Sequence, residues 1–172
     1  MIETKSLRTL ISESALKVRI EELGSSIRKV HGNSPIVCIC VLKGAYFFAA
    51  DLIRSIAGDV RIEFLHITKQ RHPTEFVPKV KYISGDVFGK RCVLIYDILD
   101  TGHSLASLMK YVRGLKPKSL CSAVLLEKPG NREVKISADF TGFSIPDEFV
   151  VGYGLGFQDK FRNLDHIAAY TP

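Results

Sequence analysis

The sequence predicts an α/β protein in which helices cover both faces of a doubly wound, mostly parallel sheet. Its 172 residues, 46% of them apolar, are enough for one sizeable core. Short runs that are apolar at every position indicate strands buried on both faces. These runs alternate with longer segments in which apolar residues recur every three or four positions, as they do along one side of a helix. Such alternation is typical of parallel sheets with helical crossovers.

The first predicted helix lies between Ser12 and Gly32. Apolar residues recur there at alternating spacings of four and three, and we expect them to form one buried stripe: Leu16, Ile20, Leu23, Ile27 and Val30. Gly32 and Asn33 end this helix. Residues 36–42 are all apolar and too few for a typical helix, so they are predicted to form a buried strand.

A second helix is predicted after the tight turn at Lys43 and Gly44. Its apolar side comprises Tyr46, Phe47, Phe48, Leu52, Ile53 and Ile56. Residues 60–68 again have strand character. The polar segment 69–75 contains a proline and is predicted to be an exposed loop, followed by a short strand over residues 79–84.

The strand and helix pattern repeats from residue 92. Residues 92–95 predict an apolar strand and residues 97–104 a polar turn, and the helix after it has an apolar stripe of Leu105, Leu108, Met109, Val112 and Leu115. Residues 123–126 predict another buried strand. From Glu127 on, turns and short strands predominate, and we expect an appendage over the sheet rather than another layer of it. Without repeats or linkers, residues 1–172 are predicted to be one domain.

Charge and composition exclude several classes of protein. The net charge of +6 comes from dispersed basic residues without interleaved aromatic ones, so a nucleic-acid partner is not expected. No apolar run approaches the roughly 18 to 20 residues that span a bilayer, and the N-terminal residues lack the order of a secretory signal. The four cysteines lack metal-ligand spacing and are interpreted as reduced structural thiols. We therefore expect a cytoplasmic protein without a membrane partner.

The strongest candidate site follows the strand over residues 92–95. Ligands of an open parallel sheet collect at the carboxyl ends of its strands, where helix N-termini present unpaired backbone N–H groups. Residues 101–105 can wrap a phosphate with such groups and two hydroxyls, and Gly102 permits a close approach. Asp97 and Asp100 cannot bind phosphate directly, but they can accept ribose hydroxyls, hold a Mg²⁺ complex or take a proton. A bare Asp-Thr-Gly would indicate only a turn; the strand before it and the helix after it favour function.

Residues 96–104 resemble the phosphoribosyl-pyrophosphate motif of type I phosphoribosyltransferases. Three further segments, 41–52, 125–129 and 142–155, resemble in the same order the hypoxanthine-guanine members of that family. The likeness extends over nearly the whole chain from about residue 10. It implies the type I phosphoribosyltransferase fold, with a small C-terminal hood. Approximately residues 127–172 would contribute this hood, which binds the base.

The resemblance implies a reaction of purine salvage. Hypoxanthine or guanine, both 6-oxopurines, would displace pyrophosphate from C1 of phosphoribosyl pyrophosphate and give IMP or GMP. The ribose would pass through an oxocarbenium-like state, so catalysis would depend on alignment and on stabilising the shifting charge. The resemblance also implies Mg²⁺ as cofactor and assembly as a homodimer or homotetramer.

Roles for individual residues come from the same resemblance. Asp100 would be the catalytic base toward purine N7, whereas Asp97 would approach the ribose hydroxyls and reach the metal only indirectly, through them. Lys43 and Gly44, whose peptide is often cis in this family, would direct backbone groups at pyrophosphate, and Arg162 would add charge as it leaves. The residues implied to bind the phosphoribosyl group are Asp97, Asp100, Thr101, Gly102, His103, Ser104 and Leu105.

Three residues are implied to bind the base. Lys128 would donate a hydrogen bond to purine O6, which favours 6-oxopurines over adenine. Phe149 would stack on the ring, and Val150 would contact its edge through backbone atoms. Taken singly, these two residues are equally typical of a core strand, and Lys128 of a solvated surface. Their joint order along the chain favours the functional interpretation.

The sequence departs from the family pattern at three places. Tyr96 stands where the family usually has an acid, and Gly156 where it commonly has an aspartate that helps to hold a second Mg²⁺. Residues 67–72 lack the Ser-Tyr pair of the family's mobile loop. These departures leave an alternative open, a catalytically weak, ligand-sensing or nucleic-acid-binding regulator on the same scaffold. Preference for xanthine over the other two bases is also left open.

Overall fold

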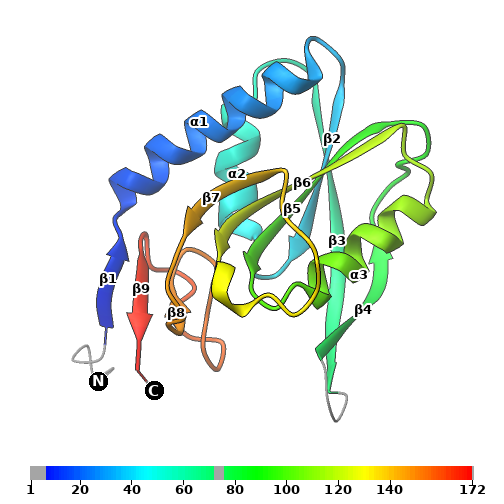
Figure 1. The fold of residues 1–172 in the computed structure, drawn as a ribbon. Helices are drawn as coiled ribbons and strands as arrows, with labels where there is room; N and C mark the ends of the chain where they lie inside the picture. Colours follow the sequence, from blue (N-terminus) through cyan, green and yellow to red (C-terminus); the bar gives the residue numbers. More distant parts are fainter. Residues whose placement is uncertain (1–6, 72–75, 172) are drawn as a thin grey trace.

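The computed structural model describes residues 7–71 and 76–171. The strands within these ranges are β1 (Leu7–Ile11), β2 (Ile36–Leu42), β3 (Val60–Arg71), β4 (Phe76–Ile83), β5 (Arg91–Leu99), β6 (Ser119–Glu127), β7 (Phe140–Ser144), β8 (Val150–Val151) and β9 (Ile167–Tyr170). The helices are α1 (Glu13–His31), α2 (Tyr46–Ser55) and α3 (His103–Gly114), with one 3₁₀ turn, η2 (Pro129–Asn131). Strands and helices alternate through most of the chain (Figure 1).

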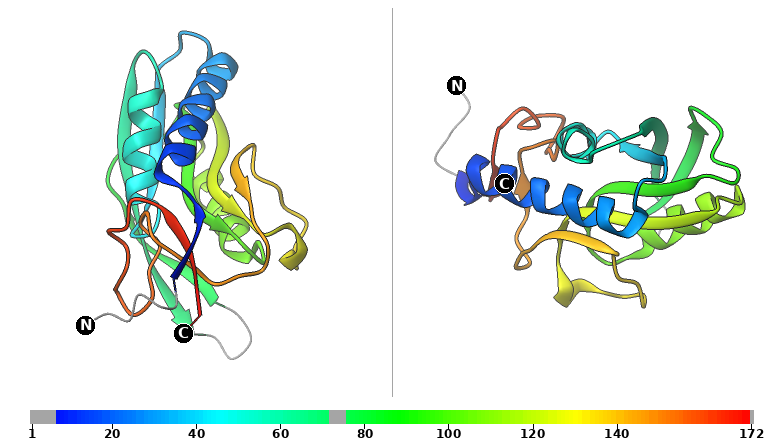
Figure 2. Two further views of the ribbon diagram at one scale, coloured as in Figure 1. Left: turned by 90° about the vertical axis from the view of Figure 1, so that its left-hand side faces the viewer. Right: turned by 90° about the horizontal axis from the view of Figure 1, so that it is seen from above.

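A six-stranded sheet in the order β4-β3-β2-β5-β6-β7 forms the centre of the molecule. All neighbouring strands run parallel except β4, which pairs antiparallel with β3. Helices α1 and α2 cover one face of the sheet and α3 covers the other (Figure 2). The predicted fold class is therefore confirmed.

Alternate residues of each central strand supply the two apolar cores. On β2, Cys38 and Cys40 pack on the side of α1 and α2, whereas Val37, Ile39 and Val41 pack on the side of α3. Because neighbouring residues of a strand point to opposite faces, a strand covered on both sides must be apolar at every position. This requirement explains the uninterrupted apolar runs of the sequence.

The first two helices form where they were predicted, with two changes in the buried residues. Helix α1 begins after Ser12, whose hydroxyl accepts a hydrogen bond from the backbone N–H of Ala15 at 3.2 Å. Val30, predicted to be buried, is 64% exposed, and His31 takes the inward position four residues after Ile27. Tyr46 and Phe47 are likewise more exposed than expected, whereas α2 buries Phe48 and Leu52, as predicted, together with Ala49.

Two predicted turns are shorter than expected. Residues 69–71 continue β3 and pair with β4, so only residues 72–75 of the predicted loop remain, and these lie outside the described residues. Strand β5 likewise continues through Asp97 to Leu99, because Ile98 and Leu99 still pair with β6. Asp97 is therefore a strand residue rather than part of a turn.

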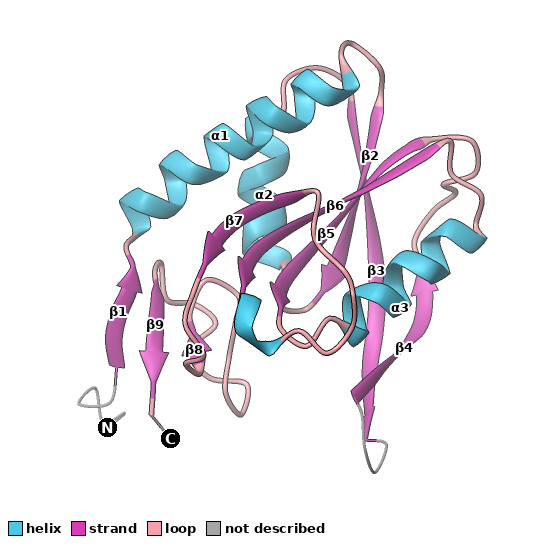
Figure 3. Cartoon of the chain, viewed as in Figure 1, coloured by secondary structure: helices cyan, strands magenta, loops and turns pink. Residues whose placement is uncertain are grey.

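The segment after Glu127 contributes to both sheets of the molecule. Strand β7 pairs in parallel with β6 and extends the large sheet, so part of the segment predicted as an appendage belongs to the sheet itself. Strands β8 and β9 join β1 in a second, three-stranded sheet in the order β1-β9-β8, which we call the hood (Figure 3). Among the described residues, no helix has both the length and the apolar character needed to span a bilayer.

Candidate active site

The carboxyl ends of β2 and β5 meet at a cavity of about 220 Å³. Four residues predicted from the sequence line it: Lys43, Gly44, Asp97 and Arg162. Tyr96 and Ile67 are also among the lining residues. The parallel sheet brings these groups together from distant parts of the sequence because its strands all end at the same edge.

Gly44 lies against the carboxylate of Asp97. A Cβ atom on Gly44 would stand 1.7 Å from Asp97 Oδ2, which leaves room for a hydrogen atom alone. Gly154 packs on the other side, where an added Cβ would be 2.3 Å from the carbonyl oxygen of Gly44. A cis peptide bond joins Leu42 to Lys43, one bond before the one that the resemblance suggested. These three segments are thus in direct backbone contact around Asp97.

Arg162 is fixed beside this cavity by the backbone of Gly154. Its Nη1 donates to the Gly154 carbonyl oxygen at 2.8 Å, and the Gly154 N–H donates to the Arg162 carbonyl at 2.9 Å. Asp159 Oδ1 lies 3.4 Å from Arg162 Nη2 and 3.9 Å from Lys43 Nζ. The Asp159 carboxylate therefore lies within ion-pair distance of both cationic side chains that line the cavity.

The predicted phosphate loop lies between β5 and α3. Gly102 adopts a left-handed conformation, with φ +98°, as the N-cap of α3. A Cβ atom there would be 2.7 Å from Ile136 and 2.8 Å from Val134, so both the backbone angle and the space require glycine. Thr101, His103 and Ser104 are partly exposed, whereas Leu105 is buried and can offer an anion only its backbone N–H. The loop is therefore open to solvent at the N-terminus of α3, where unpaired N–H groups gather.

Tyr96, which also lines the cavity, brings no negative charge to it. Its side chain is buried in the core on the α3 side of the sheet, and its hydroxyl is hydrogen bonded to Ser104. Burial, reinforced by the negative charge of Asp97, raises the pKa of Tyr96 above its ordinary value. The phenol thus stays neutral and braces the phosphate loop, and Asp97 is the carboxylate of this cavity.

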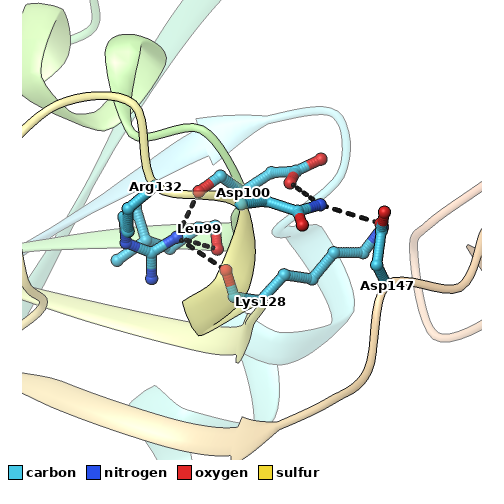
Figure 4. A network of polar contacts seen from close by, with 6 residues as sticks. Leu99, Asp100, Lys128, Arg132 and Asp147 are labelled. Carbon is cyan, nitrogen blue, oxygen red and sulfur yellow. Dashed lines mark hydrogen bonds and ion pairs between the residues drawn. The ribbon is translucent and has the colours of Figure 1, made fainter.

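A second group of polar residues surrounds Asp100 (Figure 4). Asn131 Nδ2 donates to Asp100 Oδ1 at 2.9 Å and to Asp147 Oδ1 at 2.8 Å. The Lys128 ammonium lies 3.0 Å from the same Asp147 oxygen, and the residue is only 8% exposed. Hydrogen bonds from Asn131 and Lys128 lower the pKa of Asp147, which therefore stays ionised. The chain Asp100–Asn131–Asp147–Lys128 holds an acid and a cation in one network.

Arg132 connects the ends of β5 and β6. Its Nη1 donates to the carbonyl oxygens of Leu99 at 2.8 Å, Lys128 at 3.3 Å and Asp100 (Figure 4). Its Nη2 lies 3.3 Å from Glu127 Oε2. Since the planar guanidinium satisfies several carbonyl groups at once, it fixes the turn that carries Asp100.

Replacement of Arg132 by glutamine is expected to loosen this turn. The shorter amide cannot reach the three carbonyl oxygens together, and the free energy of unfolding should fall by about 1 to 3 kcal/mol. Urea unfolding followed by circular dichroism measures this change. Arg113→Gln, which removes the same charge from an exposed position on α3, is the matched control. Equal stability of the two variants would contradict the role assigned to Arg132.

Two of the three residues predicted to contact the base, Phe149 and Val150, lie in and beside the hood. Phe149 is 47% exposed, and its ring centroid lies 5.6 Å from that of Phe157 and 6.3 Å from that of Tyr170. Val150 begins β8 and is buried, so only its backbone can face a ligand. Neither is among the described residues lining the 220 Å³ cavity.

The donor groups fit a metal ion carried by the substrate better than a resident one. No group of three or more His, Cys, Asp or Glu side chains within residues 7–71 and 76–171 is arranged to hold a metal. The cavity combines the Asp97 carboxylate with two cationic side chains and a neutral phenol. Magnesium commonly binds through one or two carboxylates together with phosphate oxygens and water.

Sequence reasoning missed several residues of the site. The missed residues are Asn131, Arg132, Asp147, Gly154 and Asp159. Asn131 and Arg132 follow shortly after the carboxyl end of β6, and this position alone could have marked them, since ligands gather at such ends. No comparable feature of the sequence marks Asp159 and Gly154, because these residues come close to the end of β2 only when the chain folds.

Comparisons with known proteins all indicate the same family. The family described as "Phosphoribosyl transferase domain" matches residues 9–158. The hypoxanthine phosphoribosyltransferase of Buchnera aphidicola is 38% identical to this chain over 167 residues, which cover 94% of each chain. The hypoxanthine-guanine phosphoribosyltransferase of Bacillus subtilis is 37% identical over 168 residues, which cover 96% of this chain and 93% of that one.

Solved structures show the same likeness. A crystal structure of a Bacillus anthracis hypoxanthine-guanine phosphoribosyltransferase, with HEPES in its active site, has a TM-score of 0.92 and 40% identity, covering 96% of this chain and 99% of that one. A Staphylococcus aureus hypoxanthine phosphoribosyltransferase gives a TM-score of 0.94 at 34% identity, covering 100% of this chain and 96% of that one.

Proposed function

The chain belongs to the phosphoribosyl transferase family, and we propose that it is a purine-salvage enzyme acting on hypoxanthine or guanine. It transfers the phosphoribosyl group of phosphoribosyl pyrophosphate to the base and yields IMP or GMP and pyrophosphate. The relatives described above are all named as enzymes, and no finding favours a ligand-sensing or nucleic-acid-binding regulator.

One observation supports this proposal more than any other. The cavity with Lys43, Asp97 and Arg162 and the network around Asp100 and Lys128 both lie at the carboxyl edge of one parallel sheet, next to the N-terminus of α3. A nucleotide needs this combination: cations for a phosphate group, carboxylates for the ribose, and separate polar groups for the base.

The phosphate and ribose ends of the substrate are assigned to the first of these regions. The 5′-phosphate lies on backbone N–H groups at the start of α3, between Thr101 and Leu105. Asp97 accepts hydrogen bonds from the ribose hydroxyls. Lys43, the Gly44 backbone and Arg162 face the pyrophosphate and stabilise the negative charge that it gains on leaving. Alignment of C1 between these groups and the base supplies most of the catalysis.

The base is assigned to the second region. Lys128 keeps donors available beyond its bond to Asp147 and donates to O6 of a 6-oxopurine; adenine presents an amino group there, which cannot accept in the same way. Phe149 stacks on the ring and the Val150 backbone contacts its edge. Asn131 orients Asp100 through Oδ1, so that Oδ2 can take the proton from N7 as N9 bonds to C1.

Magnesium, compartment and assembly complete the proposal. Mg²⁺ bound with the pyrophosphate would supply positive charge to the leaving group, and Asp97 would hold it through the ribose hydroxyls. The four cysteines are unpaired, which suits the reducing cytoplasm. Residues 1–172 form a single domain, to which approximately residues 127–172 contribute the base-binding part. A homodimer or homotetramer is expected, and sedimentation velocity measures this directly.

Turnover of a panel of bases tests the proposed function. With phosphoribosyl pyrophosphate and Mg²⁺, the chain should convert hypoxanthine and guanine and leave adenine unchanged; xanthine is the comparison that decides preference among 6-oxopurines. In Lys128→Gln, kcat/KM for hypoxanthine should fall at least about 10-fold, because a charged donor to O6 is lost. Lys110→Gln, at an exposed position of α3, is its control. No nucleotide from any base at any Mg²⁺ concentration would refute the enzyme.

A further inference from the structure

A second pocket lies at the opposite edge of the large sheet. It has a volume of about 370 Å³, and its lining comes from the amino ends of four parallel strands and the loops before them: Ser34, Pro35, Ile36, Val37, Asp59, Arg61, Gly89, Lys90, Arg91 and Lys118. Strands β2, β3, β5 and β6 begin here and end at the candidate active site, so the length of the sheet separates the two (Figure 1).

Positive charge is concentrated in this pocket. Four basic side chains line it against one carboxylate, Asp59. Lys90 is partly neutralised by Asp86, whose Oδ2 lies 3.4 Å from its Nζ. Within the described part of the chain, the side chains of Arg61, Arg91 and Lys118 form no ion pair. Three cations of the pocket are therefore not paired with a carboxylate of the described residues.

The strand register places these cations on both sides of one strand. Arg61 on β3 pairs with Val37 on β2, and Cys92, which follows Arg91 on β5, pairs with the other side of the same Val37. Lys118 is held next to Lys90, because its backbone N–H donates to the Lys90 carbonyl at 2.8 Å. Arg61 and Arg91 are strand residues, so the sheet fixes their backbone positions, which favours a preformed site.

The wall of the pocket contains further positive charge. Arg28 Nη1 donates to the carbonyl oxygen of the lining residue Ser34 at 2.9 Å, and its Nε and Nη2 are buried without a hydrogen-bond partner in the described residues. His31 accepts a hydrogen bond from the Ser34 N–H at its carbonyl oxygen. Burial, with the charges of Arg91 and Arg28, lowers the pKa of His31. Arg91 and Arg28 are thus close enough to His31 to act on its charge.

We propose that this pocket is a second anion site that binds the diphosphate group of a small molecule, either free pyrophosphate or a nucleoside diphosphate. Guanidinium groups match phosphate oxygens in charge and geometry, and Arg61 and Arg91 both line the pocket. The volume exceeds what a single phosphate fills and is within the range of pockets for small organic ligands. The site goes beyond the proposed catalytic function and does not depend on it.

Two histidines make the proposal testable in the intact chain. His31 lies beside the pocket, whereas His103 lies at the phosphate loop, 3.0 Å from Glu133. Pyrophosphate or cytidine diphosphate should shift the imidazole resonances of His31 in a saturable manner and raise its pKa, because the anion offsets Arg91 and Arg28. Equal affinity of the two probes identifies free diphosphate as sufficient, and tighter binding of cytidine diphosphate identifies a nucleotide.

Charge variants distinguish this site from general attraction of anions. Arg61→Gln/Lys118→Gln removes two exposed cations of the pocket and should weaken binding measured at His31 at least about 10-fold, with turnover of hypoxanthine unchanged. Lys17→Gln/Lys110→Gln removes the same charge from exposed positions on α1 and α3 and should bind as the parent chain does. A shift of His103 without one of His31, equal weakening in both double variants, or an equal effect of sodium chloride at matched ionic strength would overturn the proposal.

Discussion

Asp100→Asn should fold as the parent chain does and lower kcat for hypoxanthine at least about 100-fold, the scale at which loss of a general base acts. The amide keeps a carbonyl oxygen that can accept the hydrogen bond from Asn131 Nδ2, and the Arg132 bond to the backbone of residue 100 is unaffected. The network therefore survives, but the group that takes the proton from N7 is lost.

Thermal unfolding and steady-state kinetics together separate these effects. The melting temperature should change little while kcat falls, and the KM for phosphoribosyl pyrophosphate should stay close to that of the parent chain. Asp165→Asn removes the charge of an exposed aspartate that pairs with the neighbouring His166; it is the matched control and should keep full activity. Near-normal turnover of Asp100→Asn would remove this residue from the role of base.

Gly44→Ala should lower activity by a comparable factor, but for a different physical reason. The new Cβ atom would stand 1.7 Å from Asp97 Oδ2 and so must displace either the carboxylate or the backbone after β2. Backbone movement would also disturb Gly154, which packs against the Gly44 carbonyl and holds Arg162. Because catalysis here depends on alignment, displacement of about 1 Å is expected to lower kcat/KM for phosphoribosyl pyrophosphate at least about 100-fold.

The comparison with another glycine shows whether the effect is local. Gly114→Ala at the end of α3 adds the same methyl group where no atom lies within 4 Å. It should leave both stability and kcat/KM unchanged. Binding of phosphoribosyl pyrophosphate, measured by calorimetry, should weaken for Gly44→Ala alone. If Gly44→Ala binds this substrate with parental affinity, Asp97 and Gly44 do not form the site proposed for it.

The elements that were predicted well are those set by local pattern. Strand β2 agrees with the run over residues 36–42 at both ends, because burial on both faces demands an apolar residue at each position. The placement of β7 could not be predicted in this way. Its residues Phe140–Ser144 are only partly buried, and pairing with β6 depends on a strand edge that exists only after folding.

The residues of the candidate site likewise include some that a local pattern predicts and some that only the fold brings together. The phosphate loop was predicted because its residues are contiguous and follow a strand, and the structure places it at the N-terminus of α3. The orientation of Asp100 by Asn131, and the contact of Gly44 with Asp97, join residues that are far apart in the sequence. Periodicity in the sequence does not indicate contacts between distant residues, so only the folded sheet could reveal them.

The pairing order of the hood has a consequence for biosynthesis. Strand β9 is the centre of that sheet and joins β1 to β8, yet it follows every strand of the large sheet in the chain. As the chain leaves the ribosome, N-terminal segments can begin to fold first, and the phosphate loop is available before Arg162 and β9 have emerged. A nascent chain would therefore present the phosphate loop without Arg162, and the sheet of β1, β9 and β8 could form only after β9 has emerged.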